Sequence, residues 1–513
     1  MPSSQAHRTT GGRGHSRHGW RDTTIVDRRR HERLRGLRRL LLGDWTPVIR
    51  DPLDLARLAI LVGAFVTLAI GPREQSFRLA GTFLLVLVPR RLDAPRPLDL
   101  LFLAGMSFQA WGNVFGAFDH LYGYDKVVHF VLPAATSALL YLLLVRLRVV
   151  PDLAQHRGLH VRGGMVLTTF ALGLTFGGGL YEIYEWFADT VLGAHLYTSY
   201  GDTIADLLDD SIGSLIGGAL LVVWSLGGWS SRRGARGPDP DPAAVDAPVP
   251  AAASDVNLPR WLVGDWSPWL RDGLDLVRWS LVLGALGWLA TGNVEPAVRF
   301  ALTALAAFGV RRLQVPRPLD LAFLVAMAFQ AWGAAVGADA LTWWVLLSHA
   351  LVALAFAIVL YLLVVRLRLV PDLAQETDLH QRAGIALVAF ALGFSAGIWF
   401  EIYVWIADHL LGADFGVDYD RLIARLAFDA AGAFIGGAVL VLWTVRGWGT
   451  LRRIPAARLR SPRASSADRA GVDRAGMSAQ TAPARRKWDR PASGPRWTPA
   501  PAGPGAKAPG SAG

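Results

Sequence analysis

The residues best suited to chemistry in this sequence are carboxylates and one histidine that stand beside long apolar runs. Asp125 and His129 are four positions apart, so on a helix they share a face, with Lys126 beside them. Lys126 is also the only lysine before position 487. An imidazole beside a carboxylate can act as a general base, and we predict His129 as a candidate catalytic residue. Interfacial charges that merely end a helix would explain this segment equally well.

Two further segments supply carboxylates at helical spacing. One set is Glu182, Glu185 and Asp189, and the other is Asp202, Asp206 and Asp210. Carboxylates on one helical face repel each other unless a cation, a proton or a basic partner lies between them. We therefore predict a metal site formed by Glu182, Asp189, Asp202, Asp206 and Asp210, with Glu185 as a second candidate base. Such oxygen-rich ligands suit Mg²⁺, Mn²⁺ or Ca²⁺, or Zn²⁺ if His129 also binds. The alternatives are a structural salt-bridge network through Lys126 and, for Asp202, a helix N-cap.

Long apolar helices must position these residues. Hydrophobic residues make up 52% of the 513 positions and charged residues only 18%, a composition typical of membrane proteins. We expect spans at 53–71, 77–89, 98–118, 127–146, 164–187 and 204–226, each near the ~20 residues that cross a bilayer, although the second is short. The fold prediction is an all-α polytopic membrane protein. The absence of Cys excludes disulfides, thiolate metal sites and a cysteine nucleophile.

The sequence also repeats itself. Residues 140–155 (LYLLLVRLRVVPDLAQ) recur at 360–375 (LYLLVVRLRLVPDLAQ) with 14 of 16 positions identical, and PRPLDL and FQAWG recur as well. We predict two tandem repeats of six helices, about twelve spans in all, at 43–229 and 260–450. Because six is even, both repeats should have the same orientation. A basic disordered arm at 1–42, a flexible linker at 230–259 and a disordered basic tail at 451–513 complete the chain.

Arginines collect in alternate loops and thereby predict an orientation. Arg90, Arg146 and Arg232 follow the second, fourth and sixth spans, whereas residues 189–210 contain no Lys or Arg. By the positive-inside rule both termini are cytoplasmic and the acidic segments face outward. The formal charge of +11 is thus assigned to orientation, and no nucleic-acid partner is expected. The abundance of Ala, Gly, Pro and Arg indicates a bacterial plasma-membrane protein whose partner is the lipid bilayer.

Three motifs carry a resemblance to a known family. YDKVVHF at 124–130, YEIYEW at 181–186 and GDTIADLLDDSIGSLIG at 201–217 resemble the signature segments of YjdF-like bacterial membrane proteins, with a looser similarity to VanZ-like proteins. The YjdF-like group has no agreed reaction, and the VanZ-like group is associated with resistance to teicoplanin-type antibiotics. The resemblance therefore implies an integral membrane protein of the cell envelope and a site, without a mechanism. The usual family unit is a single copy, so the duplication departs from it.

The second repeat keeps only part of the polar set. His349, Glu401, Asp408 and Asp429 match His129, Glu182, Asp189 and Asp210. Val345, Leu346, Val404, Arg421 and Arg425 replace Asp125, Lys126, Glu185, Asp202 and Asp206. Two arginines in place of carboxylates should oppose a divalent cation, so we expect this repeat to be a scaffold.

Three functions fit these patterns. The first is binding or processing of an envelope lipid or lipid-linked substrate at an outward-facing site, with a divalent metal ion and with His129 or Glu185 as general base. The second is a proton-coupled transporter, although no matching acidic or broken-helix signal occurs on the cytoplasmic side. The third is a non-catalytic membrane scaffold. Whether the protein is an enzyme stays open, because the sequence contains no recognised nucleophile.

Overall fold

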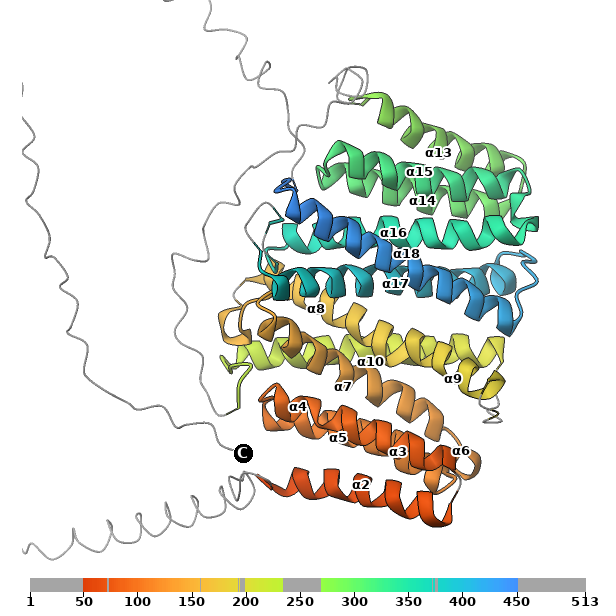
Figure 1. Cartoon of the computed structure of the whole chain (residues 1–513). Helices are drawn as coiled ribbons and strands as arrows, with labels where there is room; N and C mark the ends of the chain where they lie inside the picture. The colour runs from red at the N-terminus through yellow and green to blue at the C-terminus, as the bar shows by residue number, and fades with distance from the viewer. Residues whose placement is uncertain are drawn as a thin grey trace, which may run out of the picture. The chain divides into compact units, whose positions relative to one another are not determined.

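A computed structural model describes residues 49–71, 73–156, 158–191, 193, 199–233, 269–370, 372–373 and 377–450. Within these ranges every regular element is a helix (Figure 1). The all-α prediction is therefore confirmed. The predicted arm at 1–42, most of the linker at 230–259 and the tail at 451–513 lie outside the described residues.

We call residues 49–233 the first half and residues 269–450 the second half. The helices of the first half are α2 (Pro52–Ile70), α3 (Arg73–Val86), α4 (Val88–Arg91), α5 (Arg96–Val114), α6 (Ala117–His120), α7 (Tyr124–Arg146), η1 (Leu153–Gln155), α8 (Leu159–Gly173), η2 (Leu174–Gly179), α9 (Leu180–Thr190) and α10 (Tyr200–Leu226). Those of the second half are α13 (Gly273–Ala290), α14 (Val294–Arg312), α15 (Arg317–Ala335), η3 (Ala338–Ala340), α16 (Thr342–Arg366), α17 (Leu379–Leu410) and α18 (Tyr419–Val445).

Nine helices in the described ranges are long and apolar enough to cross a membrane. They are α2, α7, the continuous run α8–η2–α9, α10, α13, α15, α16, α17 and α18. Three other helices occupy the remaining predicted span positions: α3 has only 14 residues, and α5 and α14 are more polar. Along α2 large apolar side chains such as Phe65 and Leu68 are 65% and 59% exposed, as lipid contact requires. The chain is thus polytopic, and nine helices of the described ranges, fewer than the predicted total of about twelve, are long and apolar enough to be spans.

A buried arginine ties α2, α3 and α5 together in the first half, and another ties α13, α14 and α15 together in the second. In the first half Arg57 donates from Nε to the Val86 carbonyl at 2.7 Å and pairs with Asp54 at 2.9 Å and with Asp99. In the second half Arg278 makes the corresponding contacts, to the Ala307 carbonyl at 3.0 Å, to Asp275 at 2.9 Å and to Asp320. A buried guanidinium is stable only when its donors are satisfied, which these contacts achieve.

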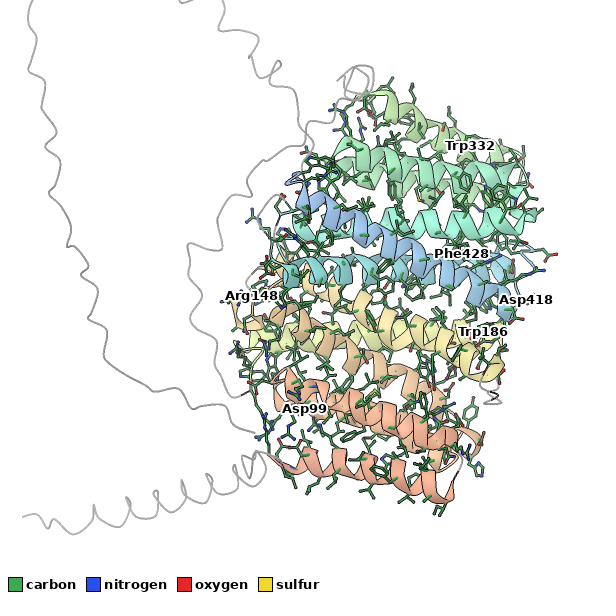
Figure 2. The ribbon with its side chains drawn as sticks, viewed as in Figure 1. Asp99, Arg148, Trp186, Trp332, Asp418 and Phe428 are labelled. Carbon is green, nitrogen blue, oxygen red and sulfur yellow. The ribbon has the colours of Figure 1, made fainter. Side chains whose placement is uncertain are left out.

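The helices have two chemically different ends. Figure 2 shows Arg148 at one end and Trp186 and Asp418 at the other; we call these the arginine end and the site end. At the arginine end Arg146 donates to the side chain and the carbonyl of Ser231, both at 2.9 Å. Arg366 makes the same pair of contacts with Thr450, at 3.0 and 2.6 Å. Each half therefore fastens the residues after its last helix in the same way.

The two halves pack against each other through α8, η2 and α17. Thr175 Oγ1 donates to the Ala391 carbonyl at 3.0 Å, and Ser395 Oγ donates to the Ala171 carbonyl at 3.0 Å. At the site end Trp186 Nε1 donates to Asp420 Oδ1 at 2.8 Å. The hydroxyls of Thr175 and Ser395 thereby have hydrogen-bond partners inside an apolar interface.

Candidate functional site

Three helices of the first half bring the polar residues together. The positive φ of Gly123 (76°) lets the chain turn into α7, which starts at Tyr124. The Ser199 hydroxyl caps α10 by accepting the Asp202 N–H at 3.2 Å. The cap is therefore Ser199 and not Asp202, because the carboxylate of Asp202 stands at the third residue of the helix.

His129 is the centre of the cluster and is 2% exposed. Its Nδ1 lies 3.2 Å from Asp210 Oδ1 and 3.8 Å from Glu182 Oε1. Its Nε2 lies 3.6 Å from Asp125 Oδ1. The imidazole thus connects residues of α7, α9 and α10.

Two overlapping sets of potential ligand atoms share this histidine. The first set is Asp125, His129 and Asp206, the second is His129, Glu182 and Glu185, and the atoms of each set lie within 4.8 Å of one another. Two donors on one divalent ion, each about 2.0–2.6 Å from it, are at most about 4–5 Å apart. The spacing is therefore compatible with a bound cation. Because His129 belongs to both sets, they form one cluster, which we call the first-half cluster: Asp125, His129, Glu182, Glu185, Asp206 and Asp210.

Several oxygens in the first-half cluster have no hydrogen-bond partner in the described part of the chain. They are both carboxylate oxygens of Glu182, Oδ1 of Asp206 and Oδ2 of Asp210. Glu182 and Asp210 are 1% and 0% exposed. Buried carboxylate oxygens without partners are rare and costly, so these atoms are positioned to accept a cation or a proton.

Charge compensation leads to the same conclusion. Among the described residues the cluster holds five carboxylates and a single imidazole. Lys126 does not supply the missing charge at its centre, because it is 55% exposed and pairs with Asp209 at 3.6 Å. Arg78, on the neighbouring helix α3, is already paired with Glu74. The predicted salt-bridge network through Lys126 is thus a peripheral contact between α7 and α10.

Two predicted ligands do not join the cluster in the described structure. Asp189 stands four residues beyond Glu185, and Asp202 stands four residues before Asp206, so each lies one turn, about 6 Å along a helix axis, from the nearest member of the cluster. Neither belongs to a set of ligand atoms within 4.8 Å among the described residues. Equal helical spacing put them on the correct face but at the wrong depth.

A π-helical turn, η2, sets the position of Glu182. Glu182 follows Gly173 by nine positions, whereas Glu401 follows the matching Gly393 by eight. The extra residue falls in η2, and the second half has the uninterrupted helix α17 there. A π-turn absorbs one inserted residue and is common at functional sites. Both glutamates consequently reach the histidine of their own half.

The second half builds a smaller cluster from equivalent positions, which we call the second-half cluster: His349, Glu401, Asp429 and Arg425. His349 Nδ1 lies 3.1 Å from Asp429 Oδ2, and His349 Nε2 lies 3.4 Å from Glu401 Oε1. Arg425 Nη1 lies 3.6 Å from Glu401 Oε2.

Arg421 is remote from this group, since its side chain is 63% exposed and pairs with Asp418 at 3.4 Å. Of the two arginines expected to oppose a cation, only Arg425 is in place to do so. Asp408, which matches Asp189, accepts the Phe415 N–H at 2.9 Å.

Some participants were not predicted from the sequence. Gln109 Nε2 donates to the Tyr181 hydroxyl at 3.3 Å, and the Tyr181 ring meets His129 edge-on with centroids 5.5 Å apart. Gly178 faces Asp210, since a Cβ there would stand 2.6 Å from Asp210 Oδ2. The glycine run in LTFGGGL was the available signal for this close approach.

The described helices and their lipid-compatible surface define the class of this protein as an all-α polytopic membrane protein. Residues 54–226 match the model of a family described as "Predicted membrane protein (DUF2238)". The match covers the first-half cluster and does not extend into the second half. No curated protein and no solved structure gave a significant match.

Proposed function

We propose that the first half binds one divalent cation between α7, α9 and α10, with ligands from His129, Glu182, Asp206 and Asp210. The observation that carries this proposal is the set of buried carboxylate oxygens without partners in the described chain. A cation would compensate the charge that a single imidazole leaves unbalanced. The oxygen-rich set suits Mg²⁺, Mn²⁺ or Ca²⁺, and the imidazole also admits Zn²⁺.

The cluster is graded in exposure, which suggests how a substrate would approach. The Asp125 side chain is 40% exposed and the Lys126 side chain 55%, whereas Glu182 and Asp210 are buried. A headgroup entering past Asp125 and Lys126 would meet a cation held below it. We propose that the site holds the anionic head of a membrane lipid or lipid-linked envelope precursor, on the outer face by the positive-inside rule. Glu185, which belongs to the same ligand set as His129, is then available as a general base.

The metal part is tested by the metal content and thermal stability of the purified protein. Wild type should retain metal after dialysis, and Asp206→Asn and Glu182→Gln should lose affinity for it. With metal bound, wild type should be more stable than Asp206→Asn. In a chelator Asp206→Asn should be the more stable protein, since it removes repulsion among carboxylates. Asp429→Asn in the second half is the matched control and should leave the metal content unchanged. A wild-type protein that binds no metal, with Asp206→Asn destabilised in chelator, would favour a purely structural network.

The headgroup part is tested in detergent by native mass spectrometry with a polyprenyl phosphate and the corresponding neutral polyprenol. Binding of the phosphate should require Mn²⁺ or Mg²⁺ and should be lost in Asp206→Asn. Equal binding of both lipids, or binding that persists in chelator, would contradict it. Metal-dependent proton uptake in proteoliposomes would instead favour the transporter.

A further inference from the structure

The second-half cluster differs from the first in one decisive way. Glu401 is 0% exposed, and its two carboxylate oxygens face two different basic side chains. Oε1 lies 3.4 Å from His349 Nε2, and Oε2 lies 3.6 Å from Arg425 Nη1. The first half has a carboxylate, Asp206, at the position of Arg425. The guanidinium therefore stands where the first half presents a carboxylate, while both Glu401 oxygens, like those of Glu182, have no hydrogen-bond partner among the described residues.

The second-half cluster holds fewer carboxylates than the first-half cluster, and one guanidinium. Two carboxylates, Glu401 and Asp429, face one guanidinium and one imidazole among the described residues. The donor atoms of His349, Glu401 and Asp429 nevertheless lie within 4.8 Å of one another, and all three residues are buried. The ligand geometry for a cation has thus been kept although a guanidinium stands where the first half has the carboxylate of Asp206.

We infer that the second half contains a latent divalent-cation site that the Arg425 guanidinium fills as a tethered cation. This inference rests on the proposed cation site of the first half for its geometry, and on Arg425 for what is new. A single residue closes the site, because Arg421 points away and pairs with Asp418. Removing Arg425 leaves a buried glutamate, aspartate and histidine at the positions equivalent to Glu182, Asp210 and His129, with their donor atoms within 4.8 Å of one another.

The test is Arg425→Asp in the full chain, with Mn²⁺ or Zn²⁺ as the probe. Bound metal should rise from about one to about two ions per chain. Arg421→Asp is the matched control: it reverses the same charge one helical turn away and should leave the content near that of wild type. A second comparison uses Arg425→Asn, which adds no carboxylate, in a background where Asp206→Asn silences the first site. The double variant should gain thermal stability when metal is added, and Asp206→Asn alone should not.

The outcomes separate the two proposals. One ion in wild type and one in Arg425→Asp, with both proteins folded by size-exclusion chromatography, overturns the latent site and leaves the first-half site standing. No ion in wild type and one in Arg425→Asp overturns the first-half site and supports the latent site. An increase that is equal in Arg425→Asp and Arg421→Asp would show general attraction by added acid and would overturn the latent site. If Arg425→Asp does not fold, the stability readout of Arg425→Asn decides.

Discussion

The two halves of this chain agree at the arginine end of their helices and differ at the site end. At the arginine end Arg57 and Arg278 make the same three contacts, and Arg146 and Arg366 fasten the residues after the last helix in the same way. At the site end the first half has five clustered carboxylates, whereas the second has two and an arginine among the described residues. The packing contacts that the halves share thus lie at one end of the helices, and the clusters that differ lie at the other.

The largest effect should come from the shared frame. Arg57→Met and Arg278→Met each leave two buried aspartates without their main cation, which typically costs about 3–5 kcal/mol of unfolding free energy. The losses should be similar in the two halves and can be measured by thermal or denaturant-induced unfolding in detergent. A loss confined to one half would mean that the frame is not shared.

The next largest effect compares Asp206 with Asp202, which lie on the same face of α10 at different depths. Asp206→Arg should copy the second half, so that the guanidinium pairs with Glu182 and metal affinity falls by at least about 100-fold, or about 2.7 kcal/mol. Asp202→Arg makes the same change one helical turn further out, and its effect should be below about tenfold. Metal titration by isothermal calorimetry compares them. Equal losses in both variants would place Asp202 in the site.

A smaller effect concerns the glycine beside Asp210. Gly178→Ala puts a methyl group 2.6 Å from Asp210 Oδ2, so the carboxylate must move, at a cost of about 1–3 kcal/mol in stability together with weaker metal binding. Gly163→Ala is the control in the same span, since a Cβ there meets nothing within 4 Å among the described residues. The control should be neutral or stabilising. Unchanged metal binding in Gly178→Ala would show that the position of Asp210 is unimportant.

The smallest effect is a pH dependence at the arginine end, in the loop between α7 and α8. Burial lowers the pKa of His156 from its usual value of 6.5, and its hydrogen bond to the Asp152 carbonyl opposes this only in part. The unfolded chain therefore takes up a proton near pH 6.5 that the folded chain resists, so stability from His156 is present above that pH and is lost as the pH falls below it.

This pH dependence is measured as the difference in melting temperature between pH 7.5 and 5.5. His156→Gln should lose less stability on acidification than wild type does. The exposed His160 provides the control variant, His160→Gln, which should behave as wild type. An identical acid response in wild type and His156→Gln would contradict this account.

Sequence periodicity predicted the helices and the meeting of His129, Glu182 and Asp210, because apolar helical patterns and intervals of three or four residues are local properties. Depth along the axis was harder to predict. Asp189 and Asp202 share a face with members of the cluster but lie one turn beyond the nearest of them. The sequence signal for the π-turn is that Gly173 and Glu182 are one residue further apart than Gly393 and Glu401. The shape of the turn depends on its packing against α7 and α10.

The buried arginines show a second limit of the sequence. The local signal for these contacts is the pair Asp54 and Arg57, three positions apart inside an apolar run, which recurs at Asp275 and Arg278. Their third partners, Asp99 and Asp320, are 42 residues away in each half. A contact at that separation depends on how the helices pack, which local spacing does not specify.

The most direct test of the central claim is the metal stoichiometry of Glu182→Gln and Glu401→Gln, measured by elemental analysis after dialysis against Mn²⁺ or Zn²⁺. The two substitutions are chemically identical, and both remove a buried glutamate beside a histidine. The account predicts about one ion per chain in wild type and in Glu401→Gln, and close to none in Glu182→Gln. Equal metal content in the two variants would contradict it.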